Sequence, residues 1–140
     1  MLSTVRLVAA VLLVVLVSCA STGDGSAGDG DDVAGAWAVA TIGGDALIEG
    51  SAPEFVLGPD GALSGDTGVN RMGGSWSRDG DALSFSEVAM TRRAGRPELM
   101  DQETRLLEAL GRTRGARIDG GALVLTDADG AELLRATRKE

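Results

Sequence analysis

The chain has 140 residues and a net charge of −8, from 13 basic and 21 acidic side chains. This length suits one domain, because domains commonly run to about 100–150 residues. There is no His and a single Cys. That composition excludes a Ser–His–Asp triad, His-ligated metal sites, thiolate clusters and an internal disulfide. The acidity repels phosphate backbones, so we expect no nucleic-acid partner.

The N-terminal segment combines one positive charge with an apolar run and the only Cys. Arg6 is followed by apolar residues from Leu7 to Val17. An apolar stretch of about 7–15 residues behind a basic start is typical of a secretory signal and is too short to span a bilayer. The run ends in Leu16-Val-Ser-Cys19, which resembles the lipobox of bacterial lipoproteins.

The lipobox resemblance implies cleavage before Cys19 and lipid attachment to the Cys19 thiol. Residues 1–18 are then a signal peptide, and two or more acyl chains anchor the protein stably. The domain would face the extracytoplasmic side of the cell membrane or outer membrane. The alternatives are an ordinary signal peptide with a chance Cys, or an uncleaved anchor. We favour the lipoprotein because the only Cys occupies the cleavage position.

Residues 19–32 are predicted to be a flexible linker that follows the lipidated Cys. After Cys19 they are Gly, Ser, Thr, Ala and Asp, which leaves nothing to bury. The Asp residues do not form an EF-hand loop, because a loop starting at Asp29 has Val33 at position 5 and Ala40 at position 12. We therefore expect no metal site here, and assign the folded domain to residues 33–140.

Strand-length segments separated by turn signals fill most of the domain. Their alternating or apolar patterns predict strands at residues 37–42, 54–57, 62–64, 74–77, 82–86, 122–126 and 131–136. Asp-Gly turns within residues 78–81 and 127–130 predict two hairpins. The Asp residues are interpreted as turn formers that cap their own backbone.

One segment has helical periodicity instead. Residues 97–110 place four leucines on one helical face: Leu99, Leu106, Leu107 and Leu110. Opposite charges four residues apart predict the ion pairs Asp101–Arg105 and Glu108–Arg112. The predicted fold class is α+β, with a mostly antiparallel, curled and barrel-like β-sheet covered in part by one α-helix.

Several short blocks follow one another between residues 37 and 136. After a Trp-containing strand come Gly68-Val-Asn70, Gly73-Gly-Ser-Trp76, Met90-Thr-Arg92 and the helix that contains Glu103. Their order resembles the META-domain (HslJ-like) family of bacterial proteins, which typically shows Gly-Cys-Asn and then Gly-x-Tyr/Trp. The resemblance implies a cell-envelope protein connected with heat response and novobiocin tolerance, without a defined active site.

The chain departs from the family pattern at two positions. Relatives often carry a Cys in the Gly-Cys-Asn block and another after the Met/Thr-Arg block. This chain has Val69 at the first position and, by alignment, Gly95 at the second. If the two Cys form a disulfide in relatives, as the resemblance implies, they are expected to be absent together, and here both are absent. A redox role based on Cys is thereby excluded.

Cys19 is the one residue to which we assign a site, as the point of lipid attachment; no catalytic, cofactor-binding or metal-binding residue is assigned. Four residues match signature positions of the family: Gly68, Asn70, Gly73 and Thr91. We interpret the glycines as turn residues and Asn70 as a left-handed or Asx-turn residue. Trp37 and Trp76 are predicted to lie in the core rather than to stack on a ligand.

Arg92, Arg93 and Arg96 form a small basic patch in an acidic chain. It could hold a phosphate, a lipid head group or an acidic partner, and the plainer interpretation is a solvated loop between strand and helix.

We expect a lipid-anchored, non-catalytic META-domain protein that binds an envelope protein, in envelope maintenance or in stress and drug tolerance. The alternative is a lipoprotein that binds or sequesters a small molecule at the curled sheet. An enzyme is disfavoured, because Ser84 and Ser86 have no His to activate them and no carboxylate pair stands out. No cofactor is expected.

Overall fold

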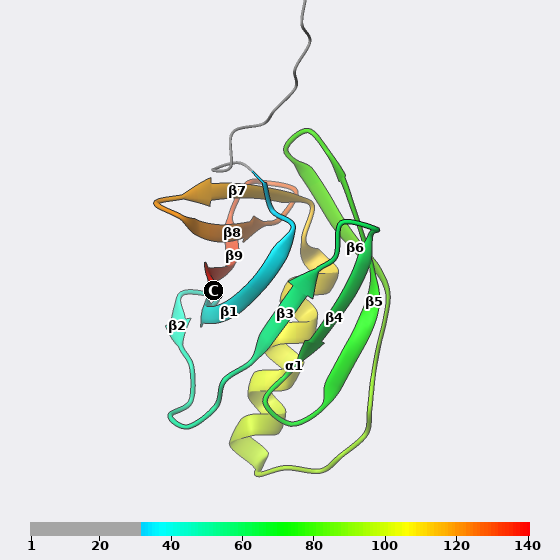
Figure 1. Ribbon diagram of the computed structural model, residues 1–140. Helices are drawn as coiled ribbons and strands as arrows, with labels where there is room; N and C mark the ends of the chain where they lie inside the picture. The colour runs from blue at the N-terminus through cyan, green and yellow to red at the C-terminus, as the bar shows by residue number, and fades with distance from the viewer. Residues whose placement is uncertain (1–31) are drawn as a thin grey trace, which may run out of the picture.

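The computed structural model describes residues 32–140, which form nine strands and one helix (Figure 1). The predicted signal peptide, Cys19 and all but the last residue of the predicted linker lie outside this range. The elements are β1 (Gly35–Ile42), β2 (Asp45–Ala46), β3 (Glu54–Leu57), β4 (Ala62–Asp66), β5 (Arg71–Asp79), β6 (Ala82–Met90), α1 (Pro97–Arg112), β7 (Gly115–Asp119), β8 (Ala122–Thr126) and β9 (Glu132–Arg138).

The strands form one antiparallel sheet that curls until its pairing returns to β1. The order is β2-β1-β3-β4-β5-β6-β7-β8-β9, and β1 also pairs with β9. Consecutive strands from β3 to β9 pair with one another, because short hairpin connections join most of them. The predicted α+β class, with a mostly antiparallel, curled sheet and a single helix, is therefore confirmed.

One junction of this sheet is much weaker than the others. β6 and β7 are aligned only at Ala82 and Gly115. Two backbone hydrogen bonds flank that pair, from Leu83 N to Arg114 O at 3.1 Å and from Ala116 N to Asp81 O at 3.0 Å. Helix α1 comes between these two strands in the chain and packs against β1, β6, β8 and β9. In Figure 1 it lies behind β3 and β4.

The core lies between the inner face of the curled sheet and α1. Its fully buried large side chains come from five strands and the helix: Trp37, Phe55, Leu57, Leu83, Leu106, Leu110, Leu123, Leu125 and Leu134. The prediction that Trp37 is a core residue is confirmed, and its indole N–H donates to Val33 O at 2.8 Å. Trp76 is half-buried, packs against the core and donates to Gly58 O at 2.9 Å.

Two strands were not predicted. β7 has one buried side chain, Ala116, and its sequence Gly-Ala-Arg-Ile-Asp offers little alternation. β2 is two residues long and exposed. Both are held by neighbours in the sheet rather than by a pattern of their own, which is why a scan of the sequence misses them.

The helix was predicted correctly, but its ion pairs were not. It runs two residues beyond the predicted end, to Arg112. Arg105 pairs with Asp45 at 2.7 Å, and Arg112 with Asp127 at 3.5 Å. Arg105 thus contacts β2, and Arg112 contacts the β8–β9 connection, in preference to the acids one helical turn earlier.

Candidate functional site

A buried polar cluster joins the β4–β5 connection to the helix. Thr67, Asn70 and Glu103 are 1%, 2% and 2% exposed. Glu103 accepts hydrogen bonds at Oε2 from the Thr67 hydroxyl and from Asn70 Nδ2, the latter at 2.9 Å. Asn70 Nδ2 also lies 3.2 Å from Oε1. A buried carboxylate is tolerated only when it is paired or hydrogen-bonded, and here two neutral donors satisfy it.

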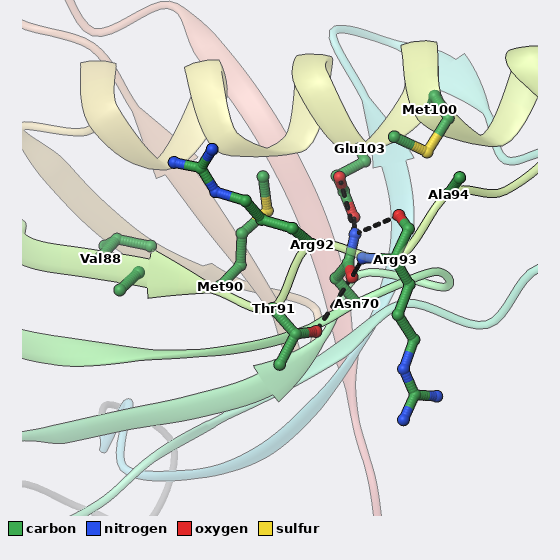
Figure 2. A pocket seen from close by; sticks show the side chains of 10 residues that line it. Asn70, Val88, Met90, Thr91, Arg92, Arg93, Ala94, Met100 and Glu103 are labelled. Atoms are coloured by element: carbon green, nitrogen blue, oxygen red, sulfur yellow. Dashed lines mark hydrogen bonds between the residues drawn. The ribbon is translucent and has the colours of Figure 1, made fainter.

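Asn70 also binds the segment that follows β6. Its Oδ1 accepts from the Thr91 hydroxyl at 2.9 Å and from Arg93 N at 2.6 Å, and its Nδ2 donates to Arg93 O at 3.2 Å (Figure 2). The Asn70 amide thus both accepts from the Arg93 backbone N–H and donates to the Arg93 backbone C=O, as a peptide group of a neighbouring strand would. Because Thr91 N donates to Arg71 O at 2.9 Å, the ladder between β5 and β6 continues past Met90.

Asn70 lies in the β4–β5 turn, but the interpretation of it as a left-handed or Asx-turn residue is wrong. Among non-glycine residues of the described chain only Glu87 has a positive φ, so Asn70 is not left-handed. The local turn is made by Thr67, whose Oγ1 accepts from Val69 N at 3.2 Å and Asn70 N at 2.9 Å. Gly68 does occupy a turn, with φ of 95°, whereas the interpretation of Gly73 as a turn residue is wrong, because Gly73 lies within β5. Asn70 instead makes contacts that are distant in sequence.

Sequence reasoning also missed Glu103 as a partner of Asn70. The signal was its place on the leucine face of the helix, four residues after Leu99 and three before Leu106. An acidic side chain on the apolar face of a helix is rarely buried unless it has a specific partner, so this position indicates one. Gln102 is a second polar residue on this face, bound to Ser51 Oγ at 3.0 Å and Ile48 N at 2.7 Å.

A groove of about 690 Å³ lies between the end of β6, the segment after it and the first half of α1. Its apolar lining comes from Val88, Ala89, Met90, Ala94 and Met100, and Asn70 and Glu103 also line it. Met90 is 38% exposed although it aligns with the buried Met72 of β5. The groove therefore leaves a core-facing methionine uncovered.

The predicted basic patch borders this groove, but its members diverge. Arg92, Arg93 and Arg96 are exposed, and within residues 32–140 none of them has an acidic partner within salt-bridge distance. Figure 2 shows Arg92 reaching toward α1 on the groove side, whereas Arg93 points away. Arg96 is the N-cap residue of the helix and does not line the groove. The predicted placement of the patch in a loop between strand and helix is confirmed, and Arg92 adds a cation to one side of the groove.

The groove offers apolar contact and a guanidinium. Of its charged lining residues, Glu103 is nearly inaccessible and already hydrogen-bonded, which leaves Arg92 and Arg93 exposed. Residues 32–140 hold no group of three or more His, Cys, Asp or Glu residues able to bind a metal ion.

The two positions where relatives often carry Cys lie side by side in this fold. A Cβ placed on Gly95 would be 3.1 Å from Val69 Cγ1 and 3.2 Å from Val69 Cγ2. This proximity is what the resemblance implies if the two Cys pair in relatives. In this chain the contact is made by Val69 and a glycine backbone.

The fold and groove define a small domain with a curled antiparallel sheet, one helix and an open groove at the end of β6. The chain belongs to the META-domain family, whose model matches residues 31–140. No curated protein matches the chain.

Solved structures resemble it at low sequence identity. A protein from Burkholderia xenovorans, solved by NMR, is 26% identical, with a TM-score of 0.56 over 75% of this chain and 81% of its own. Another NMR structure is 23% identical, with a TM-score of 0.56 over 74% and 87%. A DUF4847 family protein from Bacteroides vulgatus is 16% identical, with a TM-score of 0.50 over 62% and 59%. At such identities the last two support the fold alone.

Among residues 32–140 no helix has the length and apolar character needed to cross a membrane.

Proposed function

We propose that this protein is a lipid-anchored, extracytoplasmic META-domain protein that acts by binding and not by catalysis. The observation that carries the binding role is the open groove, in which Met90 is uncovered beside the exposed cation of Arg92. Two of its polar lining residues, Asn70 and Glu103, bond to each other, and Asn70 also bonds to the backbone of Arg93. Apolar walls with few polar groups are typical of binding sites.

The anchor rests on the N-terminal sequence. Arg6, the apolar run and Cys19 together favour a lipoprotein signal. Acylation at Cys19 would hold the domain at the membrane through the linker. The resemblance to the META-domain family supports a role in envelope maintenance or in stress and drug tolerance.

The anchor is tested by metabolic labelling with an alkyne fatty acid and by cell fractionation. We expect the wild-type chain to be labelled and to sediment with membranes, and Cys19→Ala to lose the label. Ser21→Ala is the matched control, because it lies just beyond the cleavage position and should change neither result. An unlabelled wild-type protein in the cytoplasmic fraction would overturn the anchor.

The binding role is tested with a photo-crosslinking residue placed at Met90 in the full-length protein in cells. A binding groove predicts discrete crosslinked products from Met90, and none from Arg117, which is exposed on β7 and does not line the groove. Equal products from both positions, or none from Met90, would argue against binding in the groove.

A second candidate is a lipoprotein that holds a small molecule. The groove volume of about 690 Å³ favours it, since ligand pockets commonly measure about 300–1,000 Å³. Dodecanoate is a suitable probe, because its acyl chain matches the apolar lining and its carboxylate matches Arg92. Saturable thermal stabilisation that is lost in Arg92→Glu would support this candidate.

A further inference from the structure

Most of one edge of β6 lacks a partner among the described strands. Within residues 32–140, β6 pairs with β7 only at Ala82, so from Ser84 to Met90 it has a strand partner on the β5 side alone. The far end of this edge, from Val88 onward, lines the groove. A strand edge with unpaired N–H and C=O groups is a template for another extended chain.

Hydrogen bonds after β6 define which backbone groups are available. Thr91 N donates to Arg71 O, and Arg93 N donates to Asn70 Oδ1, so both point toward β5. Backbone groups alternate in direction along an extended strand. The N–H and C=O groups of Met90 and Arg92 therefore point to the uncovered side. Asn70 thus lengthens the edge by holding residues 91–93 extended.

The side chains of this edge define what an added strand would meet. Side chains two residues apart share a face, so Val88, Met90 and Arg92 lie on the groove side. Figure 2 shows Arg92 on the side of α1 and Arg93 on the opposite side. Along the edge from residue 88 to residue 93, the apolar residues come first and the arginines follow. An added strand would need apolar side chains beside Val88 and Met90, and acidic ones beside Arg92 and Arg93.

We propose that the edge formed by residues 88–93 binds an extended peptide segment of a partner protein that carries apolar residues and a terminal block of acidic residues. The segment would pair with Met90 and Arg92 as an added strand. This inference rests on the proposed binding role of the groove and names its occupant. Charge complementarity selects an acidic segment, because the exposed charges lining the groove are arginines in a chain of net charge −8.

The test uses full-length protein in detergent and synthetic peptides. The probes are acetylated, amidated Thr-Val-Thr-Val-Glu-Glu-Glu and the same peptide with the acidic block at the other end, since either strand direction is possible at an edge. We expect one of them to bind and to slow amide hydrogen exchange at Met90 and Arg92. The Arg93 amide, already bound to Asn70, should change little.

Two altered peptides separate the contributions without changing the protein. Replacing the three Glu by Lys should weaken binding by about tenfold or more, because it sets like charges against the arginines. Methylating the backbone nitrogens on the pairing side should do the same, because it removes the strand hydrogen bonds and keeps every side chain. In the protein, Arg92→Glu should weaken binding of the acidic peptide. Arg117→Glu is the matched control and should leave that binding unchanged.

Each contrary outcome is distinct. Binding that tolerates N-methylation would overturn strand addition and leave the groove a binding site. Binding of dodecanoate with no binding of either peptide would overturn the peptide occupant and support the small-molecule candidate. If neither probe binds and Met90 gives no crosslinks in cells, both this inference and the proposed function are wrong.

Discussion

Asn70 connects three segments that lie far apart in the sequence. Its amide contacts Glu103 in the helix and Thr91 and Arg93 after β6, while its own backbone belongs to the β4–β5 connection. An amide offers two donors and an acceptor with two lone pairs, so one side chain can satisfy all of these groups. Ser, with a single hydroxyl, and Leu, with no polar group, could not replace it.

Asn70→Ala should therefore destabilise the domain. It leaves Glu103 with fewer donors and Arg93 N without its acceptor, and unpaired buried groups cost about 1–3 kcal/mol. Guanidinium unfolding measures the loss. Ser77→Ala is the control, since its exposed hydroxyl bonds only Ser84 and should cost less than about 0.5 kcal/mol. An equally small loss for Asn70→Ala would mean that water replaces the amide.

The contact between Val69 and Gly95 predicts that a disulfide can be introduced. Across a disulfide a Cβ and the opposite sulfur lie about 3 Å apart, close to the 3.1 Å between a Gly95 Cβ and Val69 Cγ1. Val69→Cys with Gly95→Cys, in a Cys19→Ala background, should gain about 2–4 kcal/mol when oxidised. Unfolding with and without dithiothreitol measures it, and each single Cys variant should show no such difference.

At the scale of elements, the β5–β6 hairpin contains a bulge that sets the end of β6. The register shifts between Gly73 and Ser75, and Glu87 adopts φ of 55° in the opposing strand. Bulges bend a strand and increase its twist. This one comes just before Val88, so it aims the last part of β6 toward the groove.

Gly74 faces the bulge and should not accept a side chain. A Cβ there would lie 2.9 Å from Ser86 O and 3.1 Å from Val88 Cα, both backbone atoms. We expect Gly74→Ala to cost about 1–3 kcal/mol by overpacking. Its neighbour provides the control, because a Cβ on Gly73 would be 3.6 Å from Leu63 O, an ordinary contact. Equal thermal unfolding temperatures for the two variants would contradict this role of the bulge.

Elements with a strong local pattern could be predicted from the sequence, and those held by distant partners could not. The hairpin at residues 78–81 and the helix face carry turn residues and periodic leucines, and both were found. β7 carries one buried residue and was missed. The helical spacing predicts an ion pair between Arg105 and Asp101, but in the fold Arg105 pairs with Asp45, which is distant in sequence. The groove was also out of reach, because it depends on how β6 and the helix pack.

At the scale of the molecule, pairing of β1 with β9 brings the two ends of the domain together. Leu134 lies at that closure, aligned with Ile42 on one side and Leu125 on the other, and it is 0% exposed. Because β1 and β9 are far apart in sequence, bringing them together costs chain entropy before their contacts can form. The core must compensate for that cost.

Leu134→Ala should accordingly be among the most damaging truncations. We expect a loss of about 2–5 kcal/mol, as for other fully buried leucines. Val56→Ala is the comparison, because Val56 is 41% exposed on β3 and buries little area. Guanidinium midpoints of the two variants measure the difference. Similar midpoints would show that the closure contributes little to stability.

The same closure has a mechanical consequence for a domain held by its N-terminal end. The chain enters the fold at β1, which pairs with β3 over residues 35–38 on one edge and with β9 over residues 37–42 on the other. Arg138 adds hydrogen bonds to Asp32 O at 2.6 Å and Ala34 O at 3.0 Å, and its guanidinium lies 4.3 Å from the Trp37 ring centroid. A pull through the proposed anchor would act along β1 and load both ladders in shear at once. The hydrogen bonds would then have to break together, not one after another as in peeling, so the entry strand is the part of the sheet best suited to bear tension.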